Sequence, residues 1–128
     1  MENLTAKEEE VMQILWDLNR ALVRDIMGKL PASNQPYTTV ASIVRILEKK
    51  GFVGHKSYGR THEYFPVISK AEYRRHKFKR FLNQYFDNSI ESVVSFLIKE
   101  EEISSKEIEE LYRIIERNSK NISRKNNE

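Results

Sequence analysis

Residues 38–51 constrain the fold more than any other part of the chain, because their apolar positions repeat with the period of a helix. The apolar row at i, i+3, i+4 and i+7 consists of Val40, Ile43, Val44 and Leu47, which is the spacing of one buried helical face. The opposite side, at i, i+4, i+7 and i+11, carries Thr38, Ser42, Arg45 and Lys49. Gly51 suits the left-handed position that follows many helices. We therefore predict an amphipathic helix that begins near Thr38 and ends at Lys50.

Two further helices are expected before this one. Thr5 and Glu8 have the spacing of a capping box, in which each side chain bonds to the backbone N–H of the other residue. The apolar stripe behind the box predicts a first helix over residues 5–19, and a shorter stripe predicts a second helix over Val23–Leu30. Pro31 and the polar residues after it end the second helix.

The segment after Gly51 is rich in β-branched and aromatic residues, which are typical of strands. It predicts a β-hairpin with strands at Phe52–His55 and Thr61–Phe65 and with Tyr58-Gly59 at the turn. Three helices followed by a two-stranded hairpin is the order of elements in a winged helix-turn-helix. The expected fold class is therefore mainly α with a small β-hairpin wing, and residues 1–68 form the expected winged helix-turn-helix domain.

The second half of the chain, residues 69–118, is expected to form a helical dimerisation region. Ser69-x-x-Glu72 and Ser104-x-x-Glu107 repeat the capping-box spacing. Three short helices cannot bury their own large apolar side chains, and leaving each one exposed costs about 1.5–3 kcal/mol. Pairing of two copies would bury them, so we expect a homodimer; an intrachain core with the first domain is the alternative. The expected dimerisation residues are Phe78, Phe81, Leu82, Tyr85, Phe86, Val94, Phe96, Leu97, Leu111 and Ile115.

The chain has a net charge of +3, but its basic side chains are concentrated in the middle of the sequence. Residues 37–62 carry five basic side chains and one acidic one, and residues 69–80 carry six basic side chains and one acidic one. Such a concentration of positive charge is typical of a surface that binds a polyanion. Residues 119–128 are polar and are expected to be frayed or disordered.

The outer face of the helix over residues 38–50 is the candidate contact with double-stranded DNA. Short hydroxyl side chains and basic side chains bond to phosphates and to base edges. The expected contacts are Thr38, Thr39, Ser42, Arg45 and Lys49 on the helix, with Lys56 and Arg60 beside the hairpin turn. N-capping is the alternative for one of the two threonines, and simple solvation is the alternative for the hairpin tip. A winged helix that binds a protein partner without reading DNA would be expected to show an apolar or acidic face instead.

Other classes of protein lack support in the sequence. The absence of cysteine removes disulfides, thiolate metal sites and a cysteine nucleophile. No apolar run approaches the roughly 20 residues of a membrane span, and the acidic N-terminus is not a secretory signal, so a cytoplasmic protein without a membrane contact is expected. His55, His62 and His76 have no acidic partners at metal-ligand spacing, and no phosphate loop or nucleophile elbow occurs. We expect no metal, no cofactor and no enzymatic activity.

Four segments carry a family resemblance: LTAKEEEVMQILW, TTVASIVRILEKKGFV, GRTHEYFP and FLIKEEEISSKEIEEL. In this order and spacing they resemble the penicillinase-repressor family of bacterial transcription regulators (the BlaI/MecI/CopY type), over about residues 4–117. The resemblance implies a homodimer with an N-terminal winged helix and a C-terminal three-helix dimerisation region. It also implies binding to a palindromic operator and repression of resistance or metal-handling genes.

Carried over to this chain, the resemblance places Thr38, Thr39, Ser42 and Arg45 in the major groove, and Lys56 and Arg60 in the wing contact. At Ile46 the chain has an apolar residue where family members often have a basic one. Many β-lactam-responsive members are inactivated by a regulatory protease, commonly at an Asn-Phe bond in the dimerisation region. The matching pair is Ser95-Phe96, which keeps the phenylalanine and lacks the asparagine. Copper-responsive members use a C-terminal cysteine motif, which this cysteine-free chain excludes.

Overall fold

The computed structural model describes residues 1–31 and 35–121 and divides the chain into two compact units. The first unit spans Met1–Phe78, and the second begins at Lys79. The sequence-based boundary, between residues 68 and 69, lies earlier in the chain. Of the tail expected over residues 119–128, the backbone at 119–121 is helical and the rest lies outside the described residues.

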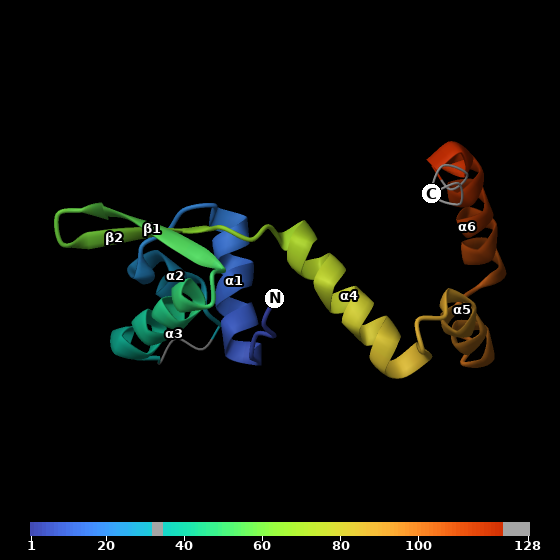
Figure 1. The fold of residues 1–128 in the computed structure, drawn as a ribbon, viewed down its shortest axis with the longest axis horizontal. Coiled ribbons are helices and arrows are strands. Elements are labelled where there is room, and N and C mark those ends of the chain that lie inside the picture. The colour runs from blue at the N-terminus through green and yellow to red at the C-terminus, as the bar shows by residue number, and fades with distance from the viewer. Residues whose placement is uncertain (32–34, 122–128) are drawn as a thin grey trace. The chain divides into compact units, whose positions relative to one another are not determined.

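The first unit contains three helices followed by a two-stranded hairpin (Figure 1), as the sequence predicted. These elements are α1 (Ala6–Leu18), α2 (Val23–Lys29), α3 (Tyr37–Lys49), β1 (Val53–Tyr58) and β2 (Thr61–Pro66). The capping box at the start of α1 is present. The Glu8 N–H donates to Thr5 Oγ1 at 3.2 Å, and the Thr5 N–H donates to Glu8 Oε1 at 2.9 Å.

Helix α3 ends in a Schellman motif, which is why the chain can leave it abruptly for the hairpin. The Gly51 N–H donates to the Glu48 carbonyl at 3.0 Å, and the Phe52 N–H donates to the Leu47 carbonyl at 2.9 Å. Gly51 has a φ of +85°, a conformation that costs glycine little. Phe52 and Leu47 are both fully buried in the core of the first unit.

Strands β1 and β2 pair antiparallel; β1 extends further toward the tip than predicted, to Tyr58, whereas β2 begins at Thr61 as predicted. The register runs from Val53 opposite Pro66 to Tyr58 opposite Thr61, which leaves Gly59-Arg60 as the two-residue loop, one residue beyond the expected Tyr58-Gly59. Gly59 has a φ of +64°, as the first position of a tight hairpin loop requires. The outer part of each strand is exposed, so backbone pairing without burial sustains it, and no apolar pattern marks it in the sequence.

Side chains from all the elements of the first unit form one core. Its most deeply buried members are Val11, Met12, Leu15, Ile26, Val40, Val44, Leu47 and Phe52. The predicted inner row of α3 is confirmed, with Ile43 at the edge of the core and half-buried. Ala21 and Tyr64 exchange backbone hydrogen bonds of 2.9 and 2.8 Å. The base of the wing is thereby hydrogen-bonded to the segment between α1 and α2, so the wing is part of the folded domain.

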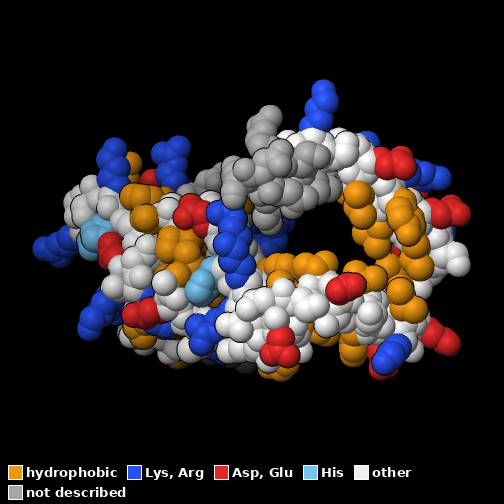
Figure 2. Space-filling model, turned by 45° about the vertical axis from the view of Figure 1, so that its right-hand side comes forward, with side chains coloured by type: hydrophobic (Ala, Val, Ile, Leu, Met, Phe, Trp, Pro, Cys, Tyr) orange, Lys and Arg blue, Asp and Glu red, His pale blue; other side chains and the backbone are white. Residues whose placement is uncertain are grey.

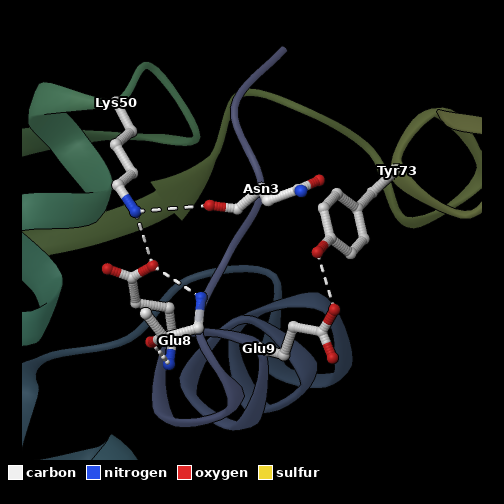
Figure 3. A network of polar contacts seen from close by, with 6 residues as sticks. Asn3, Glu8, Glu9, Lys50 and Tyr73 are labelled. Atoms are coloured by element: carbon white, nitrogen blue, oxygen red, sulfur yellow. Dashed lines mark hydrogen bonds and ion pairs between the residues drawn. The ribbon is translucent and has the colours of Figure 1, made fainter. Parts of the chain in front are cut away.

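A buried carboxylate on α1 connects the N-terminal segment with the end of α3 (Figure 3). Glu8 is 5% exposed, and its Oε1 lies 2.7 Å from Lys50 Nζ. The same ammonium group donates to the Asn3 carbonyl at 3.4 Å. Burial alone would raise the pKa of Glu8, but hydrogen bonds from Lys50 and the Thr5 backbone, with the charge of Lys50, hold it below its ordinary value. The ionised form of Glu8 is therefore the form that the fold stabilises.

The first turns of α4 (Lys70–Phe86) belong to the first unit because they pack against α1. The Tyr73 hydroxyl donates to Glu9 Oε1 at 2.6 Å (Figure 3), and Lys77 pairs with the same carboxylate. Burial and the hydrogen bond to Glu9 raise the pKa of Tyr73, so the hydroxyl stays protonated and remains a donor. These contacts place the division between the units within α4, after Phe78.

The second unit contains the rest of α4 followed by α5 (Ile90–Lys99) and α6 (Ser105–Arg117). The predicted capping box opens α6, where Ser104 Oγ accepts from the Glu107 N–H at 3.1 Å. In these two helices, all of whose residues the structure describes, no side chain is buried. Apolar side chains of this unit are exposed, as the orange groups at the right of Figure 2 show.

Candidate nucleic-acid interface

The outer face of α3 exposes all the hydroxyl and basic side chains assigned to it: Thr38, Thr39, Ser42, Arg45 and Lys49. N-capping, the alternative for one of the two threonines, is wrong, because the N-cap residue is Pro36 and no side-chain cap bond is present among the described residues. Both threonines lie inside the first turn, and their hydroxyls bond to no residue that the structure describes. The row is therefore free to bind an external partner.

Arg45 and Ile46 lie together further along this face. Arg45 Nε donates to the Ala41 carbonyl one turn earlier at 3.3 Å, which leaves the other guanidinium N–H groups available. Ile46 is 45% exposed, and helical spacing places it next to Ser42 and Lys49. An apolar side chain thus interrupts an otherwise polar surface.

The two basic residues assigned to the wing occupy different positions in the hairpin. Arg60 lies in the two-residue loop at the tip, whereas Lys56 lies within β1 opposite Glu63. Lys56 Nζ is 5.4 Å from the centre of the Tyr58 ring, a distance typical of a cation–π contact. Both side chains are exposed and can approach a phosphate backbone.

A cleft of about 370 Å³ opens between α2, α3 and β2. Three arginines line it, Arg24 from α2, Arg45 from α3 and Arg60 from the wing tip, and we call it the arginine cleft. Sequence reasoning missed Arg24. The only signal was a basic residue near the start of the second helix, and its approach to the other two arginines depends on tertiary packing.

Two stacked histidines lie beside the arginine cleft. The rings of His55 and His62 have centroids 4.3 Å apart and planes 7° apart, and His55 Nδ1 is 2.5 Å from Glu48 Oε2.

Burial, followed by the nearby charge of Glu48, raises the pKa of Tyr64, which also lines the cleft. Among the residues that the structure describes, no three His, Cys, Asp or Glu side chains are grouped to hold a metal ion. The contact between Glu48 and His55 joins the last turn of α3 to β1.

The expected dimerisation residues lie on the second half of α4, on α5 and on α6. Of the ten, Leu82, Phe86 and Leu97 are half-buried. The others are exposed: Phe78, Phe81, Tyr85, Val94, Phe96, Leu111 and Ile115.

The pair considered for proteolysis, Ser95-Phe96, lies within α5, and both side chains are exposed. The Phe96 ring meets the Phe86 ring edge-on, with centroids 5.7 Å apart. The peptide bond between the two residues is thus held in a helix, and the Phe96 ring contacts the Phe86 ring at the end of α4.

The sequence model of the family described as penicillinase repressor matches residues 4–117. The chain belongs to the penicillinase repressor family. The penicillinase repressor of Bacillus licheniformis is 30% identical over 111 residues, which is 85% of this chain and 86% of that relative. The methicillin resistance regulatory protein MecI of Staphylococcus aureus strain N315 is 26% identical over 113 residues, covering 88% of this chain and 92% of the relative. The solved DNA-binding domain of the repressor BlaI is 25% identical, with a TM-score of 0.49, over 57% of this chain and 94% of that domain.

Membership of the penicillinase repressor family confirms the resemblance drawn from the four sequence segments. The family is one of DNA-binding transcriptional repressors and not of enzymes, and this coarse function extends to the chain. Within residues 1–31 and 35–121, no helix is long and apolar enough to cross a membrane.

Proposed function

We propose that the chain is a homodimeric, sequence-specific repressor that binds a palindromic operator with one α3 and one wing in each half-site. The observation that carries the proposal is the outer face of α3, where the hydroxyls of Thr38, Thr39 and Ser42 bond to no residue that the structure describes and lie beside exposed basic side chains. Hydroxyls and guanidinium groups on a helix face are the groups that bond to base edges and phosphates in the major groove. The names of the relatives support a resistance gene as the target, and a cytoplasmic location belongs to the same proposal.

The apolar surface of the second unit supports the homodimer. Tyr85 is 70% exposed, and Phe96 and Ile115 are about half exposed, at 47% and 52%. Burying such a side chain contributes about 1.5–3 kcal/mol, so self-association of this surface is favourable. A two-fold symmetric dimer presents two identical winged-helix domains, which matches the two-fold symmetry of a palindromic site.

A titration of fluorescent duplexes tests the DNA proposal. The chain should bind the upstream region of its own gene more tightly than a scrambled duplex, with an affinity that falls steeply as salt rises, since neutralised phosphates release counterions. Arg45→Ala should reduce this preference by about tenfold, the size of one lost charged hydrogen bond. Equal affinity for operator and scrambled duplexes, unchanged by Arg45→Ala, would favour a protein partner for α3 instead.

We also propose that a regulatory protease relieves repression by cutting between Ser95 and Phe96. The position of this pair within α5, beside the Phe86 ring, supports the idea that cutting would disrupt the apolar surface of the second unit. Mass spectrometry of the protein from cells exposed to a β-lactam should reveal fragments that end at Ser95 and begin at Phe96. Recovery of the intact chain while repression is relieved would exclude this route.

A further inference from the structure

We propose that the arginine cleft binds a single phosphate group of the DNA backbone and thereby connects α2, α3 and the wing to one point of the duplex. The identity of the ligand as DNA rests on the proposed function. The preference for a phosphate group rests on the charge and the hydrogen-bond donors that line the cleft.

Charge is the first argument. Arg24 and Arg60 form no hydrogen bond or ion pair with any residue of the described chain, and Arg45 uses only its Nε. The described residues that line the cleft include no aspartate or glutamate. Arg24 from α2, Arg45 from α3 and Arg60 from the wing tip therefore face one space that no described acidic side chain lines, and a bound anion would offset their mutual repulsion.

The donor chemistry of the cleft selects phosphate among anions. A guanidinium group offers parallel N–H donors that match two oxygens of a phosphate. Tyr37 and Thr61 line the same space and add hydroxyl groups, and His62 adds a ring nitrogen. A volume of about 370 Å³ accommodates a phosphodiester with bound water, while arginines around the rim reach it from several directions.

The position of the cleft identifies the DNA backbone as the source of the phosphate. Arg45 belongs both to the cleft and to the outer face of α3, and Arg60 belongs both to the cleft and to the wing tip. A duplex that contacts these two surfaces at once must pass its backbone across the space between them. Arg24 then binds the phosphate without reading sequence, so it contributes affinity and register and leaves specificity to α3.

The test compares Arg24→Gln with Lys29→Gln, which removes one positive charge from the same helix. Lys29 is exposed and lies near Asp17 and Leu18 of α1, away from the cleft. Arg24→Gln should weaken binding to operator and scrambled duplexes alike, by about tenfold or more, and should lower the salt slope by about two, since one phosphate contact is lost in each half-site. Lys29→Gln should leave both quantities close to those of the unchanged chain.

Neutral methylphosphonates placed one at a time along the operator then locate the phosphate. At one position in each half-site, the substitution should weaken binding of the unchanged chain and of Lys29→Gln, and should have no further effect on Arg24→Gln. A penalty at every position that is the same for all three proteins would overturn the proposal.

A titration without DNA separates this proposal from the proposed function. Inorganic pyrophosphate should shift the NMR signals of the Nε–H groups of Arg24 and Arg60 and leave that of Arg113, on α6, unmoved. If pyrophosphate shifts these signals while no duplex binds, the DNA source and the proposed function fail together, and the cleft is a site for a free phosphate ligand. If neither pyrophosphate nor any single methylphosphonate has an effect while operator binding persists, the cleft proposal alone is overturned.

Discussion

Ile46 has the chemistry least expected on the outer face of α3. It is 45% exposed, and its helical neighbours on that face are Ser42 and Lys49. Apolar side chains discriminate thymine through its C5-methyl group in the major groove. At the scale of a single residue, Ile46 is thus a candidate contact for the methyl group of a thymine.

We predict that removing one thymine methyl from each half-site of the operator weakens binding only while Ile46 is present. Replacement of both thymines by deoxyuridine should raise the Kd of the unchanged chain by roughly tenfold or more, because about 0.8 kcal/mol is lost per buried methyl and two methyls are removed. The same replacement should leave the Kd of Ile46→Ala unaltered. Fluorescence anisotropy with a series of singly substituted duplexes measures both effects, and a uracil penalty that persists in Ile46→Ala would assign the contact to another side chain.

The free energy of unfolding depends on pH through the ion pair of Glu8 and Lys50. We predict that Lys50→Met lowers the free energy of unfolding at pH 7 by about 1–3 kcal/mol, because it leaves a nearly buried carboxylate without its partner. The folded-state pKa of Glu8 lies below its ordinary value of 4.5. The stabilisation is therefore complete above that value and is lost as pH falls through the folded-state pKa. Urea titrations at several pH values should show the gap between the two proteins closing below about pH 4. A constant gap down to pH 3 would contradict the assignment.

At the scale of elements, the end of α3 depends on one backbone conformation. Gly51 has a φ of +85°, and a Cβ added there would meet no atom within 4 Å. We predict that Gly51→Ala lowers the free energy of unfolding by about 1–2 kcal/mol, entirely through the left-handed conformation and without a clash. Gly28→Ala is the matched control, because Gly28 lies in α2 with ordinary φ and with equally open space.

Gly28→Ala should leave the free energy of unfolding unchanged or raise it by about 0.5–1 kcal/mol, since alanine favours a helix interior. Thermal unfolding followed by circular dichroism compares the two variants directly. Equal melting temperatures for Gly51→Ala and Gly28→Ala would show that the helix stop does not depend on glycine.

The elements were predictable where local chemistry and burial act together. Apolar periodicity and capping boxes marked α1 and α6, and Gly51 marked the end of α3, because each of these signals lies within a few residues of the backbone that it controls. The start of α3 was placed one residue late, since Pro36 at the N-cap makes no side-chain bond that a sequence pattern can reveal. The exposed end of β1, residues 56–58, was missed because no apolar pattern marks it in the sequence.

The candidate site was predictable on α3 and incomplete elsewhere. Thr38 to Lys49 form a row on one helix, so spacing alone brings them together. Arg24 comes near Arg45 and Arg60 only after α2, α3 and the wing have packed around the same space. Contacts of that kind are tertiary, and one sequence read by itself carries no local signal for them.

At the scale of the whole molecule, the exposed apolar side chains of the second unit predict the assembly. We predict that Leu111→Glu converts a homodimer into a monomer, because a charge in an apolar interface is not solvated. Lys106→Glu, also on α6 but one of its polar residues, is the control and should remain dimeric. Sedimentation equilibrium at micromolar concentration distinguishes about twice the chain mass of 15.2 kDa from the single mass. A monomeric mass for the unchanged chain would remove the basis of the two-fold operator.

Loss of the dimer should also weaken operator binding far more than binding to a single half-site. In a dimer, binding of one winged-helix domain to its half-site raises the effective concentration of the second domain at the other half-site, and a free monomer lacks this gain. Leu111→Glu should therefore bind the full operator and an isolated half-site with similar affinity. A strong preference for the full operator in a proven monomer would show that pairing occurs on the DNA through another surface.

The short path between α3 and the wing has a further consequence. Lys50, Gly51 and Phe52 alone separate the last residue of α3 from the first residue of β1, and backbone hydrogen bonds hold all three. The fold therefore fixes the distance between α3 and the wing, and this distance stays the same whichever duplex the domain binds. Changes of DNA preference in such a domain are confined to its outward side chains. A substitution at a residue such as Ile46 can alter which bases are preferred, while the distance between the base contacts and the wing contact stays constant.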